Sequence, residues 1–222
     1  VLAASAIIGA GAVLVLPKQT PVAVSREVSS PVRVLVTIWR SGPLRRALGL
    51  TIVVAFSVAA LPIYAVAVAP SLGGAALAGV LVAGYGVGGL AGSVLLMVRP
   101  FKGDADRLTS VLSGGVAAAL VVVVPASNLI LALAAFTVVG VANSLFFAAT
   151  LAARSEYSPS ESRGQVFIWV GALKIAAGAV GTAVAGVLDG GATWLPVAAA
   201  AVLSATSSLW CIAERRRVGH QS

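Results

Sequence analysis

Six long apolar stretches follow one another along the chain, and each is close to the length that a helix needs to cross a lipid bilayer. They cover residues 44–69, 74–98, 108–125, 127–151, 164–188 and 192–213. A spanning helix needs about 20 apolar residues, whereas the strands of a membrane barrel alternate in polarity over about ten. Lipid offers the backbone no hydrogen-bond partners, so long continuous stretches must be helical. The sequence therefore predicts an all-α, polytopic membrane helix bundle.

The composition also favours lipid over water as the solvent. The 222 residues are 59% hydrophobic and 10% charged, whereas an average soluble domain is about 25% charged. The net charge of +8 does not indicate nucleic-acid binding, because the basic residues lie between apolar stretches and not on one water-exposed face. The single Cys211 and the single His220 exclude an intramolecular disulfide and a Cys/His metal site. We expect the lipid bilayer as a partner, and no nucleic acid, metal or cofactor.

The first 43 residues divide into a short apolar stretch and a polar segment. Residues 1–16 are too few for a complete span, so we predict part of a transmembrane helix. A secretory signal peptide is the alternative, but no basic region precedes the stretch. We predict that residues 17–43 form a cytoplasmic linker. Its apolar residues Val32, Leu35, Val36 and Trp39 recur at helical spacing, which fits either an amphipathic helix on the membrane surface or an ordinary solvated linker.

The distribution of basic residues gives the orientation. Of the 15 lysine and arginine residues, all except Lys174 fall in the linker up to residue 46, in the loops around 99–107 and 154–163, or in the tail after 213. The three loops on the other side, 70–73, 125–128 and 189–192, contain none. Because basic segments stay in the cytoplasm, we expect a cytoplasmic C-terminus.

Lys174 is the only charged residue deep inside a predicted span. An ammonium at that depth costs about 2.5 to 3.5 kcal/mol, so it should face protein or a water-filled cavity. Phe167, Gly171, Gly178 and Gly181 lie on its helix face, and the glycines leave room beside its stem. Two interpretations stay open. Lys174 binds an anionic or hydrogen-bonding group of a substrate or carries a proton, or it is a snorkelling or structurally hydrogen-bonded lysine.

Two further patterns predict local structure within the spans. Pro62 has no N–H to donate to the carbonyl of Val58, so a kink is expected there. Gly84, Gly88 and Gly92 repeat every four residues, a pattern typical of close helix packing. A dinucleotide-binding loop is excluded because no strand precedes these glycines.

The arrangement as a whole resembles the second half of a transporter of the major facilitator superfamily. The shared features are a long basic linker, six spans after it and a small cytoplasmic loop after the second of them. Residues 102–107 keep the Asp106-Arg107 pair of the family's loop motif, although Gly103 is displaced by one position and the final basic pair is absent. Residues 156–167, followed by Lys174 and Gly178, are similar to the start of the eleventh helix in drug-efflux-like members from actinobacteria.

The resemblance implies a division of the chain and a function. Residues 1–16 would be the sixth helix of the whole protein, 44–213 a six-helix half-bundle and 214–222 a cytoplasmic tail, with a further six-helix half preceding them. The implied function is proton-coupled efflux of small solutes across a bacterial cell membrane by alternating access. The expected substrate and ion pathway comprises Tyr64, Asn143, Phe146, Phe147, Trp169 and Lys174. Asp104, Asp106 and Arg107 would belong to a gating loop.

Two other functional classes are alternatives to transport of this kind. A channel, or the permease subunit of an ATP-driven importer, would use residues 152–164 as its only candidate coupling segment. A membrane-embedded enzyme would place His, Asp, Glu or Cys at mid-depth, and the predicted spans contain none there. We therefore expect no enzymatic activity.

The orientation can be tested by labelling single cysteines in intact cells. In a Cys211→Ala background, a membrane-impermeant maleimide should modify Ser71→Cys from outside and should modify Lys102→Cys only after the cells are permeabilised. Labelling of Lys102→Cys in intact cells would contradict the whole topology.

Overall fold

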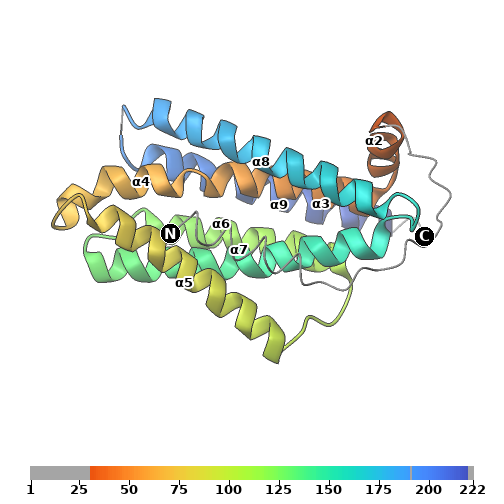
Figure 1. The fold of residues 1–222 in the computed structure, drawn as a ribbon, viewed down its shortest axis with the longest axis horizontal. Coiled ribbons are helices and arrows are strands. Elements are labelled where there is room, and N and C mark those ends of the chain that lie inside the picture. The colour runs from red at the N-terminus through yellow and green to blue at the C-terminus, as the bar shows by residue number, and fades with distance from the viewer. Residues whose placement is uncertain (1–30, 191, 220–222) are drawn as a thin grey trace, which may run out of the picture. The chain divides into compact units, whose positions relative to one another are not determined.

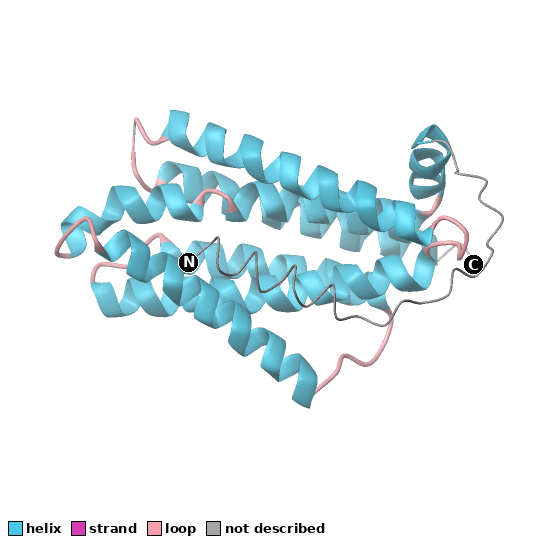
Figure 2. Ribbon diagram, viewed as in Figure 1, coloured by secondary structure: helices cyan, strands magenta, loops and turns pink. Residues whose placement is uncertain are grey.

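The computed structural model describes residues 31–190 and 192–219, and all regular structure in these ranges is helical. The elements are α2 (Pro31–Arg40), α3 (Gly42–Val58), α4 (Leu61–Val68), a 3-10 turn (Ala69–Leu72), α5 (Leu77–Val98), α6 (Ala105–Val123), α7 (Leu129–Tyr157), α8 (Arg163–Leu188) and α9 (Leu195–Gly219) (Figure 1). Figure 2 shows helices joined by loops and no strand in this part of the chain. The all-α class is thus confirmed. The partial helix predicted at 1–16 and the linker up to residue 30 lie outside the described residues.

Six helical segments are long and apolar enough to cross a membrane. They are Gly42–Leu72, Leu77–Val98, Ala105–Val123, Leu129–Tyr157, Arg163–Leu188 and Leu195–Arg217. They correspond in order to the six predicted stretches. Their outer faces carry large exposed apolar side chains, among them Ile130, Ile168 and Val187, which a water-soluble protein would bury. These features indicate a multi-pass membrane protein.

The first span is broken where the kink was predicted. α3 ends at Val58 and α4 begins at Leu61, with Ala59 and Ala60 in a turn between them. The Ala60 N–H donates to the Ser57 carbonyl at 3.2 Å, which is the tighter bonding of a 3-10 turn. Pro62 causes the break because its ring nitrogen cannot donate to the carbonyl of Val58.

The glycines of α5 bring this helix into backbone contact with α7. A Cβ atom added at Gly88 would overlap the backbone oxygen of Thr137, and one added at Gly140 would overlap the backbone oxygen of Tyr85. Only glycine permits this approach from both sides, so the close packing predicted from the glycine repeat is confirmed. α7 also packs against α6, and α3 packs against α6, α7, α8 and α9.

Hydroxyl pairs link the helices inside the bundle. The Ser204 hydroxyl on α9 donates to Ser57 on α3 at 2.9 Å, and the Ser113 hydroxyl on α6 donates to Ser208 on α9 at 3.0 Å. All four side chains are buried. Because lipid cannot satisfy a hydroxyl, each pair favours the packed arrangement by about 0.6 kcal/mol.

α2 is a helix with two apolar faces. Val34 and Ile38 are buried against Leu44 of α3 and Val166 and Val170 of α8. The residues singled out from the sequence, Val32, Leu35, Val36 and Trp39, are exposed on its other face. The helical interpretation is therefore confirmed, whereas contact of the exposed face with the membrane stays a prediction.

The described basic segments lie toward one end of the bundle, in the right half of Figure 1, with the α5–α6 loop starting at the lower middle. This end, called the basic end below, carries α2, the α5–α6 loop, the α7–α8 loop and the end of α9. The opposite end carries the 3-10 turn and the α6–α7 and α8–α9 loops. The loops with basic residues and the loops without them therefore lie at opposite ends of the bundle, as the sequence predicted.

The α5–α7 contact gives a prediction about stability. Gly88→Ala should destabilise the protein by about 1 to 3 kcal/mol, because the added methyl group meets backbone that cannot rotate away. Gly86→Ala is the matched control on the same helix, since nothing lies within 4 Å of its added Cβ. Thermal unfolding in detergent should show a lower midpoint for Gly88→Ala alone, and equal midpoints would contradict the packing.

Candidate functional site

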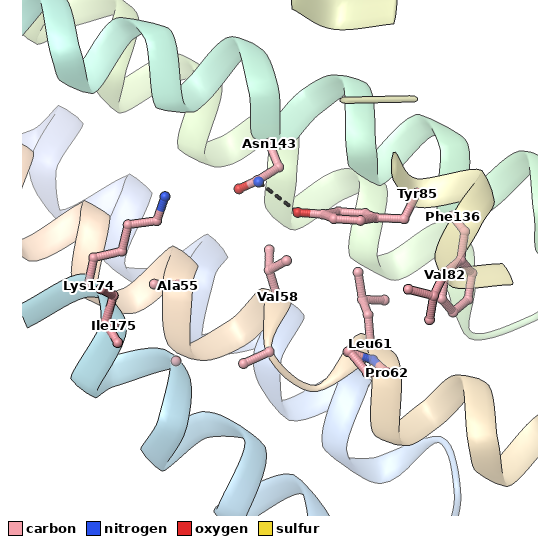
Figure 3. Close-up of a pocket in the computed structure, with 12 residues that line it drawn as sticks. Ala55, Val58, Leu61, Pro62, Val82, Tyr85, Phe136, Asn143, Lys174 and Ile175 are labelled. Carbon is pink, nitrogen blue, oxygen red and sulfur yellow. Dashed lines mark hydrogen bonds between the residues drawn. The ribbon is translucent and has the colours of Figure 1, made fainter. Parts of the chain in front are cut away.

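A pocket of about 360 Å³, called the central pocket below, opens among five helices. Its walls are mainly apolar, and Tyr85, Asn143 and Lys174 supply the polar side chains (Figure 3). The remaining lining residues are Ala55, Val58, Ala59, Leu61, Pro62, Val82, Phe136, Ile175 and Gly178. The break between α3 and α4 therefore forms part of the wall, and an apolar pocket with a few polar groups is the usual form of a small-molecule site.

Lys174 reaches the central pocket from α8. It lies eleven residues after Arg163, which places it about 16 Å along the helix. Its Nζ atom lies 3.8 Å from the centroid of the Phe147 ring on α7, which is cation–π geometry. No described carboxylate forms an ion pair with it. The lysine therefore faces protein and a pocket, as expected from the cost of exposing it to lipid.

Asn143 and Tyr85 form a hydrogen-bonded pair on the other side of the pocket. The Asn143 side-chain amide on α7 donates to the Tyr85 hydroxyl on α5 at 2.7 Å, and Figure 3 shows both groups at the pocket. Within the described part of the chain, the amide oxygen of Asn143 and the hydroxyl hydrogen of Tyr85 have no partner. The sequence pointed to Asn143 and missed Tyr85, although a tyrosine among the glycines of a predicted span was a signal.

Arg154 is buried, although the sequence placed it in a loop. α7 continues to Tyr157, because Ala152 and Ala153 favour helix and no proline follows until Pro159. The Arg154 side chain is 3% exposed. Its guanidinium donates to the Thr51 hydroxyl at 3.4 Å and to the Thr150 hydroxyl at 3.3 Å.

Part of the hydrogen-bonding capacity of Arg154 is unused. Its Nε atom is buried without a partner, and no described carboxylate pairs with its charge. The guanidinium carbon lies 5.9 Å from the centroid of the Phe167 ring on α8. The buried guanidinium therefore contacts two hydroxyl groups and one aromatic ring, and no described carboxylate.

Three other predicted pathway residues lie away from the central pocket. Phe146 is in the main core. Tyr64 is also in the core, stacked against Phe136 and donating to the Val123 carbonyl at 3.4 Å. Trp169 packs on the small cluster beneath α2. Neither these three nor Phe147 is among the residues that line the pocket, although the Phe147 ring contacts Lys174.

A cluster of ion pairs ties α3, α6 and α9 together at the basic end. Its members are Arg45, Arg46, Asp104, Asp106, Glu214 and Arg215. Arg46 Nε and Nη2 donate to the two carboxylate oxygens of Asp106 at 3.0 and 2.7 Å, and both side chains are buried. Such bidentate pairing is strong and geometrically specific.

The remaining pairs of this cluster are more exposed. Glu214 pairs with Arg45 and lies 3.6 Å from Arg46, while Arg215 lies 3.5 Å from Asp104. Asp104 also caps α6 by accepting from the Arg107 backbone N–H at 2.7 Å. Of the predicted gating residues, Asp104 and Asp106 therefore join the cluster, and Arg107 contributes only its backbone. The sequence did not reveal Arg46 as the partner of Asp106, since sixty residues separate them.

Comparison of the chain with protein-family models, curated proteins and solved structures gives no match. In residues 31–190 and 192–219, no three His, Cys, Asp or Glu side chains are grouped so that they could hold a metal ion. The central pocket contains a lysine, an amide and a phenol, which can bind and orient a polar group on a solute.

The ion-pair cluster gives a prediction with a built-in control. Asp106→Asn should destabilise the protein by about 3 kcal/mol, because the buried Arg46 loses its bidentate partner and keeps only Glu214, 3.6 Å away. Asp104→Asn should cost less than about 1 kcal/mol, since its pair is exposed and asparagine also caps helices. Denaturation in detergent tests both variants, and equal stabilities would contradict the buried pairing.

Proposed function

We propose that the six-helix bundle is one half of a secondary transporter resembling the major facilitator superfamily, and that it moves small amphipathic solutes across the bacterial cell membrane. The observation that carries this proposal is the central pocket, in which Tyr85, Asn143 and Lys174 meet among apolar walls. Each of the three lies in the interior of a helix long enough to span a membrane. Secondary transporters bind their solutes near the middle of the bilayer, at the junction of two repeats.

The helix break beside the pocket supports the same function. Irregular backbone at membrane depth is tolerated where it faces a cavity, and Ala59, Leu61 and Pro62 line this one. Broken helices at a central binding site are a recurring feature of secondary transporters.

A second six-helix half would close the open side of the pocket. Rocking of the two halves would then expose the solute alternately to each side of the membrane. The basic end would face the cytoplasm, where the ion-pair cluster holds α3, α6 and α9 together in one state of the cycle. This chain alone is expected to give no transport, because it supplies only one wall of the site.

The charges at the pocket limit where a coupling proton could bind. None of the residues lining the pocket is acidic. If protons drive efflux, the carrying carboxylate lies in the other half or Lys174 carries the proton. A membrane-embedded enzyme is disfavoured because none of the residues that line the pocket is His, Asp, Glu or Cys.

Transport can be tested in vesicles made from cells that produce the complete transporter. A hydrogen bond to a charged group contributes about 1.5 to 3 kcal/mol. Lys174→Met should therefore slow the movement of a fluorescent amphipathic dye by about tenfold or more. Lys102→Met is the matched control, since this exposed loop lysine lies outside the pocket.

The transport rates of Lys174→Met and Lys102→Met are compared with each other and with the wild-type rate. Loss of dye movement in Lys174→Met alone supports the proposal. Wild-type rates in both variants across chemically diverse dyes would overturn it.

A further inference from the structure

One face of α7 carries a continuous series of polar and cation-binding residues from the central pocket toward the basic end. Asn143, Phe147, Thr150 and Arg154 are spaced by four, three and four residues, so they lie one above another on one side of the helix. The series covers about 16 Å along the axis. Contacts from two other helices meet it: Lys174 of α8 lies over the Phe147 ring and Thr51 of α3 accepts from Arg154.

Two cations meet at this face, Arg154 of α7 and Lys174 of α8, and no described anion pairs with either. Lys174 lies over the ring of Phe147, and Arg154 follows Phe147 on α7 by seven residues, about two turns. Asp104, Asp106 and Glu214 are committed to the ion-pair cluster at the basic end, and none of the described carboxylates pairs with either cation. A charge removed from water is costly unless it is paired. The ring of Phe147 and the hydroxyls of Thr51 and Thr150 compensate these charges only in part.

We infer that the solute of the central pocket carries an anionic group, a carboxylate or sulfonate on an apolar body, and that Lys174 binds it while the buried charge of Arg154 adds to the positive potential. The inference rests on the proposed function and specifies the substrate class of the same site. The apolar walls contact the body of the solute, and the unused hydrogen of the Tyr85 hydroxyl can donate to the anionic group. A cationic solute would be repelled by both charges.

The sign of the potential in the pocket can be measured with a thiol reporter. Val58→Cys in a Cys211→Ala background places one thiol in the pocket wall of the full chain, reconstituted in lipid nanodiscs. The reaction rates with negatively and positively charged methanethiosulfonates of similar size are each divided by the rate with a free thiol. The anionic reagent should be favoured by about tenfold.

Matched variants assign that preference to one side chain. Lys174→Met should remove most of it, Lys174→Arg should keep it because the charge is kept, and Lys102→Met should leave it unchanged. A ratio at or below one, a ratio insensitive to Lys174→Met, or no reaction with either charged reagent would overturn the inference.

Binding is tested by protection of the same thiol from a neutral maleimide. Naphthalene-1-sulfonate should slow the modification, whereas 1-naphthylmethylamine, a cation of similar size at neutral pH, should not. Equal protection by the two probes, or protection that survives Lys174→Met, would contradict an anion site.

These measurements do not depend on transport, so the two proposals can fail separately. If the pocket thiol prefers the anionic reagent but no solute moves in the vesicle assay, the proposed anion site stands and the proposed transport function is wrong. If dye movement depends on Lys174 but the pocket thiol reacts no faster with the anionic reagent than with the cationic one, the proposed transport function stands and the proposed anionic solute is wrong.

Discussion

Lipid cannot form hydrogen bonds with a protein, and this constraint explains where the polar groups of the bundle lie. The hydroxyls of Ser57 and Ser204 bond to each other, and the buried guanidinium of Arg46 is matched to the carboxylate of Asp106. Lys174 and Arg154 depart from this rule, because neither has a described counter-ion. An unpaired cation is costly in a bilayer, and the proposed anion site rests on this departure.

The packing of the helices and the geometry of the pocket depend on each other. α5 and α7 touch through Gly88 and Gly140, and the Gly140 contact is with the backbone of Tyr85. The same approach brings the Tyr85 hydroxyl within hydrogen-bonding distance of Asn143, nearly one turn further along α7. On the other side, the break before Pro62 shapes the wall that faces Lys174. The backbone contact that packs α5 against α7 therefore also positions the Tyr85–Asn143 pair at the pocket.

The sequence predicted those features that depend on local patterns. Continuous apolar stretches predicted the six helices, Pro62 predicted the break, and the spacing of Gly84, Gly88 and Gly92 predicted close packing, because each reflects one segment and its solvent. Pairings between distant segments were not predictable in this way: Tyr85 with Asn143, and Arg46 with Asp106, depend on which helices become neighbours. Arg154 was misplaced in a loop because its charge suggested water, whereas helix-forming alanines carry α7 past it. Phe146 and Tyr64 were expected in the pathway and lie in the core, since helical spacing alone does not say which face meets the pocket.

The central claim is that lipid covers the outside of the bundle while water and charge reach its interior. Spin labels attached to Val180→Cys on the exposed face of α8 and to Val58→Cys in the pocket, in bilayers, test it directly through their collision rates with oxygen and with a water-soluble nickel chelate. We predict that oxygen dominates at position 180 and that the chelate dominates at position 58. Equal accessibility at the two positions, or a chelate that reaches position 180 more readily, would contradict the account.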